Sequence, residues 1–326
     1  MMVKLKTKTV LGLSIAIILV LLSFVFYLYQ PGVILNLFAR DNCKSLRYSG
    51  TRDNRINIVF VPSGFHGDMK SFEWKVKTMW KDFESYTPFN PAITELNAFY
   101  VPRENWPTNN FCYRINPLSP QFVFCRPAIA KTLSRDCLKG LHETVVVVND
   151  GTMGGGGFFT PVNLHVASVT VKPGNSYISN SSQIAVHELS HILFGFGDEY
   201  NEKQNTYSKD NVPNCDVAGC PKWKDLMGVF KDVACQKGGC TDGNYYTGGK
   251  SSIMSDNYGP FTSNQERNAC CLYKARTGNF PGSLCAKFAV KVVSPLNDYC
   301  NQNQPDKSLL TEDYSAKSLN GAQLTF

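Results

Sequence analysis

The sequence HELSH at residues 187–191, followed by DEY at residues 198–200, decides how the rest of the chain is interpreted. Residues four positions apart lie on one face of a helix, so the imidazoles of His187 and His191 can bind one metal ion. Glu188 lies beside them, where its carboxylate can take a proton from a water on the metal. This pattern is typical of zinc-dependent hydrolases. We therefore expect Zn²⁺ on this helix and Glu188 as the general base.

The way this helix ends predicts a third metal ligand. A serine or asparagine at residues 180–182 can cap its start, and Gly195 can end it because glycine accepts the left-handed conformation. The chain can then turn back so that Asp198 reaches the metal. Catalytic zinc sites need three protein ligands and one open position for water, and Asp198 supplies the third. Glu199 is the alternative, because it is adjacent and is also a carboxylate.

A bare HExxH string also arises by chance, and the simpler interpretation is a surface helix with a solvated glutamate. The chain has 5 histidines, however, and two of them fall in this pattern, followed by a helix-ending glycine and a carboxylate. We therefore favour a metal site. Two other classes of protein stay open. One is an inactive, protease-like surface protein that binds ligands, and the other is a structural protein with a stabilising zinc, whose fourth ligand would be His165 or Glu199.

Several segments resemble one known group of enzymes. The helix, its glycine turn and the sequence SIM at residues 252–254 look like the metzincin clan of zinc peptidases. Within that clan, HELSH and the following DEY most resemble the IgA-specific metallopeptidase family. The strand and turn at residues 58–65, and the segments at residues 88–90 and 97–101, are also similar to that family. The resemblance covers roughly residues 55–270.

The resemblance implies a metzincin-like catalytic domain, with a mixed twisted sheet above a cleft, the zinc helix as its floor and Met254 in a turn beneath the metal. It also implies a zinc-dependent metalloendopeptidase that hydrolyses a protein or peptide substrate. Two features depart from the clan. In the clan, the glycine follows the second histidine more closely and the third ligand is a histidine. In this chain, the corresponding residues are Gly195 and Asp198. In some clan members, a tyrosine two residues after the methionine assists catalysis. That position is Asp256 here, so the nearby Tyr258 becomes the candidate for stabilising the oxyanion.

The first thirty residues have the composition of an uncleaved membrane anchor. Lys4, Lys6 and Lys8 precede an uncharged run at residues 10–29, and about 20 apolar residues span a bilayer as a helix. No small-residue cleavage site closes the run, which favours an anchor over a signal peptide. With the lysines inside, residues 31–326 are expected to be extracytoplasmic. The net charge of +7, part of which these lysines supply, is too mild and scattered to indicate nucleic-acid binding.

The cysteines and the composition predict how the chain is divided. All 12 cysteines follow the apolar run, and an even number outside the membrane indicates disulfides rather than a second zinc site. Their pairing and the oligomeric state stay open. We expect a juxtamembrane stalk at residues 31–54, the metallopeptidase domain at residues 55–295, divided into parts 55–181 and 182–295, and a polar tail at residues 296–326.

The order of the predicted elements is that of an α/β fold. A helix is expected at residues 68–84 from its apolar spacing, and irregular structure stapled by disulfides at residues 201–246. Strands are expected at residues 56–61, 98–102, 144–148, 165–171 and 286–294. The glycine-rich sequence at residues 153–159 is expected to form a flexible loop beside a sheet edge, where another backbone can approach closely. An edge strand near residues 158–171 could pair with an extended substrate.

Overall fold

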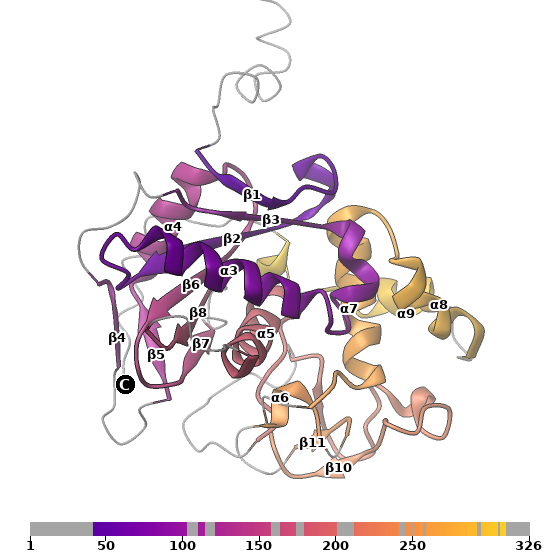
Figure 1. Cartoon of the computed structure of the whole chain (residues 1–326). Coiled ribbons are helices and arrows are strands. Elements are labelled where there is room, and N and C mark those ends of the chain that lie inside the picture. Colours follow the sequence, from indigo (N-terminus) through magenta and orange to yellow (C-terminus); the bar gives the residue numbers. More distant parts are fainter. Residues whose placement is uncertain are drawn as a thin grey trace, which may run out of the picture. The chain divides into compact units, whose positions relative to one another are not determined.

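A six-stranded sheet lies at the centre of the fold (Figure 1). Its order is β1-β3-β2-β6-β8-β7, with bounds β1 Lys44–Arg47, β2 Ile56–Ser63, β3 Leu96–Tyr100, β6 Glu143–Asn149, β7 Gly155–Gly157 and β8 Val166–Val171. Strands β2, β3, β6 and β8 run parallel, whereas the edge strands β1 and β7 are antiparallel to their neighbours. The predicted α/β class with a mixed sheet is therefore confirmed.

The computed structural model describes residues 42–102, 110–114, 121–157, 164–173, 179–200, 212–240, 245–249, 251–256, 259–291, 295–305 and 307–310. These residues belong to one unit that begins at Asn42. Within these ranges, no helix is both long and apolar enough to cross a bilayer. The predicted anchor at residues 10–29 and the first part of the predicted stalk lie outside the described residues.

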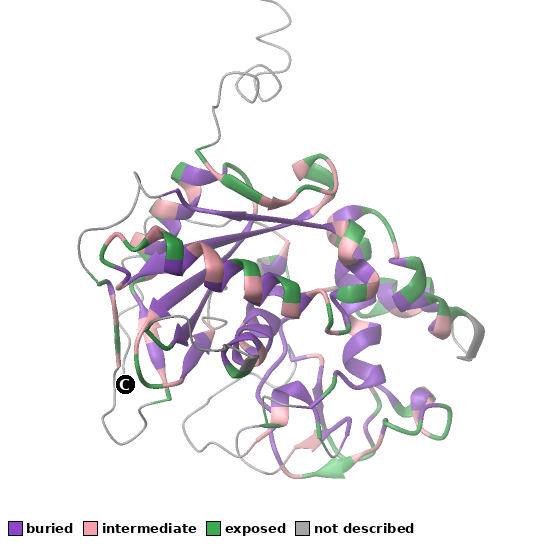
Figure 2. Ribbon diagram, viewed as in Figure 1, coloured by how far each residue is buried: buried purple, intermediate pink, exposed green. Residues whose placement is uncertain are grey.

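Helices cover both faces of the sheet. Successive side chains of a strand point to opposite faces, so each face carries apolar side chains that pack against helices. Helices α3 (Met69–Phe83) and α5 (Ser179–Phe194) pack on the face that carries Val145, and α4 (Pro127–Cys137) packs on the face that carries Val146. Figure 2 shows the central strands buried and β1 largely exposed. Strands buried on both faces are typical of parallel sheets, which explains the valine-rich sequence of β6.

Helix α3 confirms the helix predicted at residues 68–84. Asp68 caps its start by accepting a 3.1 Å hydrogen bond from the N–H of Ser71. The side chains that face the sheet recur with helical spacing and are buried, namely Phe72, Val76, Met79, Trp80 and Phe83.

The second half of the chain is made of short elements stapled by disulfides. Three strands pair in the order β10-β11-β9, with bounds β9 Cys215–Asp216, β10 Gln236–Lys237 and β11 Tyr246–Thr247. They are followed by helices α6 Ile253–Asp256, α7 Ser263–Thr277, α8 Gly282–Lys291 and α9 Leu296–Gln302. Elsewhere, β4 (Cys112–Arg114) pairs with β5 (Val123–Cys125). In the described part of the chain, 3₁₀ helices span Arg52–Asn54, Asn90–Glu95, Lys224–Leu226 and Lys307–Leu309.

All twelve cysteines form disulfides, as the even count predicts. The pairs are Cys43–Cys137, Cys112–Cys125, Cys215–Cys240, Cys220–Cys235, Cys270–Cys285 and Cys271–Cys300. The first pair ties the start of the described chain to the end of α4. Lys44–Arg47, which we expected in a stalk, is strand β1 of the central sheet and pairs with β3.

The strand predicted at residues 286–294 is wrong. This segment lies largely in helix α8, whose residues Leu284, Cys285 and Phe288 are buried at helical rather than alternating spacing. The predicted polar tail is also structured at its start, because α9 is tied to α7 by the Cys271–Cys300 disulfide. Residues 311–326 lie outside the described part of the chain.

The glycine-rich segment also differs from its prediction as a loop. Residues Gly155–Gly157 form strand β7, which pairs antiparallel with β8. Among the described strands the sheet therefore ends at β7, and β8 lies inside it between β6 and β7. The edge strand that we expected near residues 158–171 is in fact β7.

Candidate metal centre

Helix α5 brings His187 and His191 together on one face, as the i, i+4 spacing predicts. Both side chains are buried, with 1% and 4% exposed, and their Nε2 atoms lie 3.1 Å apart. The helix begins at Ser179, one residue before the segment that we predicted would cap it. It ends at Phe194, and Gly195 follows with φ +69°, in the left-handed conformation predicted for it.

The turn at Gly195 returns the chain so that Asp198 reaches both histidines. Oδ1 of Asp198 lies 3.0 Å from Nε2 of His187 and 3.2 Å from Nε2 of His191. Two donor atoms bound to zinc at about 2.0–2.1 Å on a tetrahedron are roughly 3.3 Å apart. The three atoms thus have nearly the mutual separations that three zinc ligands need.

Hydrogen bonds on the far side of each ring leave Nε2 available to a metal. Nδ1 of His187 lies 2.7 Å from the carbonyl oxygen of Ile253, and Nδ1 of His191 lies 2.6 Å from that of Phe196. A carbonyl oxygen only accepts, so each Nδ1 carries the proton. Both Nε2 atoms then direct lone pairs toward the Asp198 carboxylate. Such a group of three donor atoms is suited to bind a cation placed between the rings and the carboxylate.

The charges in this group are strongly coupled in the metal-free protein. Burial disfavours the imidazolium form of His191, but the Asp198 carboxylate outweighs burial and raises the pKa of His191 to about 9. In return, although burial alone would raise it, the two histidines hold the pKa of Asp198 well below its usual range. The metal-free site therefore holds a proton at neutral pH, which a metal ion must displace.

Glu188 lies at the edge of the same group. Its Oε2 is 4.0 Å from Nε2 of His191, and its side chain is 12% exposed. One ligand atom from each of His187, Glu188 and His191 lies within 4.8 Å of the others. Burial raises the pKa of the Glu188 carboxyl. A carboxylate of raised pKa beside a metal is suited to accept and return a proton.

The alternative ligands take other roles in the structure. Both oxygens of Glu199 accept hydrogen bonds from side chains other than the histidines. His165, which we considered as a fourth ligand, lies before β8 with its Nδ1 3.0 Å from the Glu143 carboxylate. Tyr258, the predicted oxyanion residue, lies outside the described residues.

The segment around Met254 contacts the metal helix through the carbonyl of Ile253. Met254 is fully buried in α6, and its carbonyl accepts a 2.8 Å bond from the N–H of Glu199. The preceding residue, Ile253, supplies the carbonyl that orients His187. The ring of Tyr200 stacks on His187, with centroids 6.3 Å apart and planes inclined by 17°. The sequence motif contains Tyr200, but its spacing gave no reason to place this ring against a ligand.

Strand β7 lies directly on the metal helix, so the close approach expected at these glycines occurs in a strand rather than in a loop. A Cβ on Gly155 would lie 2.7 Å from Oε1 of Glu188, and one on Gly157 would lie 3.0 Å from Cβ of His191. On the other side of the strand, a Cβ on Gly156 would lie 2.7 Å from the carbonyl of Val123. The run of glycines is thus explained by close approach on both faces of β7, rather than by a flexible loop.

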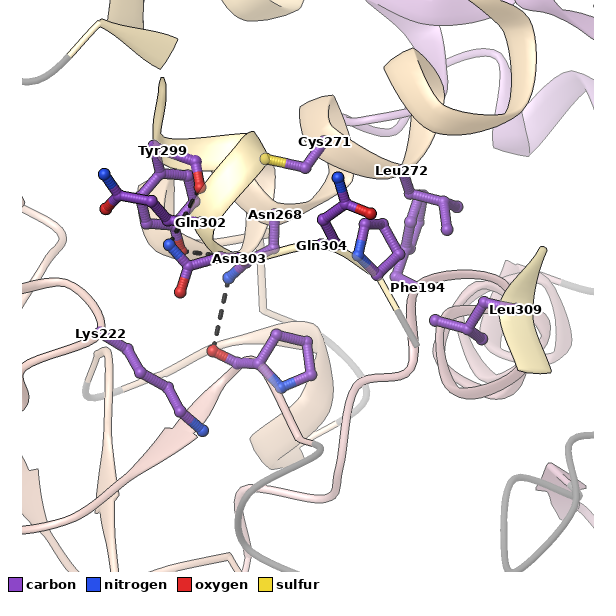
Figure 3. A pocket seen from close by; sticks show the side chains of 12 residues that line it. Phe194, Lys222, Asn268, Cys271, Leu272, Tyr299, Gln302, Asn303, Gln304 and Leu309 are labelled. Carbon is purple, nitrogen blue, oxygen red and sulfur yellow. Dashed lines mark hydrogen bonds between the residues drawn. The ribbon is translucent and has the colours of Figure 1, made fainter. Parts of the chain in front are cut away.

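A cavity of about 310 Å³ lies apart from the metal ligands, near the end of α5 (Figure 3). Among the described residues that line it are Phe194, Lys222, Asn268 and Tyr299, but none of the histidine or carboxylate side chains of the metal group. Lys222 is bonded to two backbone carbonyls, at 2.9 and 2.8 Å. We therefore assign the chemistry to the metal group and not to this cavity.

An α/β fold that brings an HExxH helix and a returning carboxylate together is typical of metal-dependent hydrolases. A family model described as IgA Peptidase M64 matches residues 134–233, which include α5 and Asp198. The match supports an IgA-peptidase-like metallopeptidase family and confirms the resemblance to that family over these residues. A search of curated proteins finds no match.

Proposed function

We propose that this chain is a zinc-dependent metalloendopeptidase, in which His187, His191 and Asp198 bind the metal and Glu188 is the general base. The observation that carries the proposal is the convergence of three donor atoms within 3.0–3.2 Å of one another, with both Nδ1 atoms held by carbonyls. Two imidazoles and a carboxylate are ligands that zinc prefers in catalytic sites. The IgA Peptidase M64 match supports peptide bonds as the target.

Zinc in such a site supplies a Lewis acid that polarises a carbonyl and lowers the pKa of water to about 7. Glu188 accepts the proton of the attacking water and returns it to the leaving amine, because its raised pKa suits both steps. The carbonyls of Ile253 and Phe196 keep the two imidazoles in the tautomer that binds metal. Tyr258 stays our candidate for stabilising the oxyanion.

Strand β7 is the proposed place for an extended substrate. It is the last strand of the sheet, and it lies against the helix that carries Glu188 and His191. An extended peptide can add to such an edge through main-chain hydrogen bonds. Phe122 already pairs with Gly155 at one end, and the N–H of Gly155 is bonded to the carbonyl of Gln121. Because alternate residues of a strand face opposite neighbours, the substrate would pair with β7 at Gly157.

We also propose that the enzyme is membrane-anchored, with its catalytic domain outside the cytoplasm. The uncharged run at residues 10–29 and the lysines before it support the anchor. The six disulfides support an oxidising compartment for the residues that follow, because disulfides persist there.

Metal analysis combined with a peptide-cleavage assay tests this proposal on the purified full-length chain. We expect about one zinc per chain and cleavage of a mixed peptide library. Glu188→Gln should keep the zinc and lose about 10²–10⁴-fold in kcat, the usual contribution of a general base. His187→Ala should lose both zinc and cleavage. Glu84→Gln, a partly exposed carboxylate on another helix end, serves as the control and should behave as the wild type.

Two results would reject the enzyme. Zinc bound by the wild type, with cleavage absent from both the wild type and Glu188→Gln, indicates a structural metal. A wild-type chain that carries no stoichiometric transition metal contradicts the proposal as a whole.

A further inference from the structure

Glu199 follows Asp198 and is buried, with 5% of its surface exposed. Its carboxylate accepts hydrogen bonds from the side chains of three separate segments. Oε2 accepts a 2.6 Å bond from the hydroxyl of Ser252. Oε1 accepts bonds from Nδ2 of Asn214, at 3.0 Å, and from Nε2 of Gln265, at 2.9 Å. A buried carboxylate is therefore the point at which the segments before β9, before α6 and within α7 meet.

Hydrogen bonds to Asn214 and Met254 fix the backbone on the two sides of Asp198. The amide of Asn214 accepts a 2.8 Å bond from the N–H of Gly197 and donates a 2.8 Å bond to its carbonyl. On the other side, the N–H of Glu199 donates a 2.8 Å bond to the carbonyl of Met254. Asp198 thus lies between two anchored residues, which limits where its carboxylate can point.

Glu199 also holds the segment that orients His187. Its partner Ser252 directly precedes Ile253, whose carbonyl accepts the 2.7 Å bond from Nδ1 of His187. The Ser252 oxygen accepts a 3.2 Å bond from the N–H of Met254 as well, which ties the hydroxyl to the start of α6. A displacement of Ser252 would therefore displace the carbonyl that selects the tautomer of His187.

We propose that Glu199 is a positioning residue, which holds Asp198 and the Ile253 carbonyl in their metal-binding positions before the metal arrives. It acts through its neighbours and is not itself a ligand. The inference rests on the proposed function in one respect, since it takes His187, His191 and Asp198 as the metal site. Groups that hold metal ligands from behind commonly change metal affinity 10–100-fold when they are removed.

The chemistry of this position requires a carboxylate. Oδ1 of Asn214 accepts from the N–H of Gly197, and Oε1 of Gln265 accepts from the N–H of Thr262 at 2.9 Å, so both amides turn NH₂ groups toward Glu199. The carboxylate accepts from these two amides and from a hydroxyl. A glutamine that kept its oxygen toward the two amides would turn its NH₂ group toward Ser252, whose oxygen already accepts from the N–H of Met254 and from Nε2 of Gln265. Glu199→Gln is therefore disruptive although it keeps the shape of the side chain.

The test compares Glu199→Gln with the wild type in the full-length chain. Zinc affinity is measured by competition with a chelator, and the geometry of the metal is read from the ligand-field absorption of a Co²⁺-loaded sample. We expect zinc affinity to fall 10–100-fold and the Co²⁺ bands to shift in energy and intensity. In the metal-free protein, NMR should show a slowly exchanging imidazole Nδ1–H for His187 in the wild type and a fast-exchanging one in Glu199→Gln.

Glu266→Gln is the matched control, because Glu266 is a buried carboxylate on α7 whose partner is Lys287. It should lower the thermal unfolding temperature without changing the Co²⁺ spectrum or the His187 signal. The proposal is overturned if Glu199→Gln keeps wild-type zinc affinity and spectrum, or if it changes only the unfolding temperature, as the control does. The NMR readout needs no metal, so a failure of this inference is distinguishable from a failure of the metallopeptidase proposal.

Discussion

Nε2 of His187 and Nε2 of His191 lie 3.1 Å apart, although each ring carries its proton on the opposite nitrogen. Two lone pairs that face each other at this distance, with the Asp198 carboxylate beside them, need a positive charge between them. In the metal-free protein a proton meets this need, and the pKa of His191 is raised to about 9. The pairing of the two rings therefore makes the site a competition between protons and metal ions.

This competition predicts that zinc binding releases about one proton at pH 7.5. Since His191 is protonated below a pKa of about 9, zinc affinity should weaken about tenfold per unit as pH falls below that value and should level off above it. Calorimetry of zinc binding in two buffers of different ionisation enthalpy measures the proton directly. Equal binding heats in both buffers would show that no proton is displaced.

Asp198→Asn should weaken zinc binding, whereas Asp256→Asn, a change of a nearby acidic residue in α6, should not. The first change removes the charge that lies 3.0 and 3.2 Å from the histidine Nε2 atoms, so we expect zinc affinity to fall at least 100-fold and cleavage to be lost. Asp256→Asn is the control, because Asp256 bonds Ser251 and the N–H of Gly259 instead. Chelator competition measures both variants, and equal losses of affinity would contradict the assignment of Asp198.

Gly155→Ala should damage both stability and activity. The new Cβ would meet Oε1 of Glu188 and Cγ2 of Ile184, each at 2.7 Å, so β7 and α5 must move apart. Overpacking of this kind costs about 1–3 kcal/mol in the free energy of unfolding, and the shifted Glu188 should lower kcat at least tenfold. Gly151→Ala has open space within 4 Å and should change neither quantity. Denaturant unfolding and peptide cleavage test both, and a fully active Gly155→Ala would refute the close contact.

The buried cluster of Glu143, His165 and Arg276 predicts a loss of stability in acid. Burial alone would raise the pKa of Glu143, but His165 and Arg276 outweigh burial and lower this pKa to about 2. A carboxyl whose folded-state pKa lies below its unfolded value of about 4.5 contributes stability that is present above pH 4.5 and is lost as pH falls toward 2. The contribution is ~3 kcal/mol.

Denaturant unfolding between pH 6 and pH 3 measures this loss. Glu143→Gln should be less stable at pH 6, because it leaves Arg276 without its carboxylate partner, and it should lose less stability than the wild type as pH falls. Parallel pH curves for the two proteins would assign the acid sensitivity to other groups.

Local sequence determined the elements in which one periodicity was unambiguous. The i, i+4 histidines and the helix-ending Gly195 predict α5, and the apolar spacing predicts α3, because these patterns depend only on the geometry of the chain itself. The valine-rich run of β6 predicts a buried strand for the same reason. The reach of Asp198 follows from the length of the turn after Gly195.

Short segments were harder to interpret, because their patterns fit more than one structure. Residues 286–294 alternate in polarity, but packing and the Cys270–Cys285 disulfide select the helix α8. A run of glycines does not distinguish a mobile loop from a strand pressed between two layers. Contacts with α5 and Val123 show that β7 is a strand packed between two layers.

The sequence by itself determined that two imidazoles would share one helix face, because covalent spacing and helical pitch fix that relation. Only the tertiary structure decided which of the adjacent acids lies against the histidines, since Asp198 and Glu199 are alike in chemistry and one residue apart. Their side chains diverge because Asn214, Ser252 and Gln265, brought from distant segments, hold Glu199 away from the histidines. Such a choice depends on where the donors of the folded chain lie, and spacing along the sequence carries no record of it.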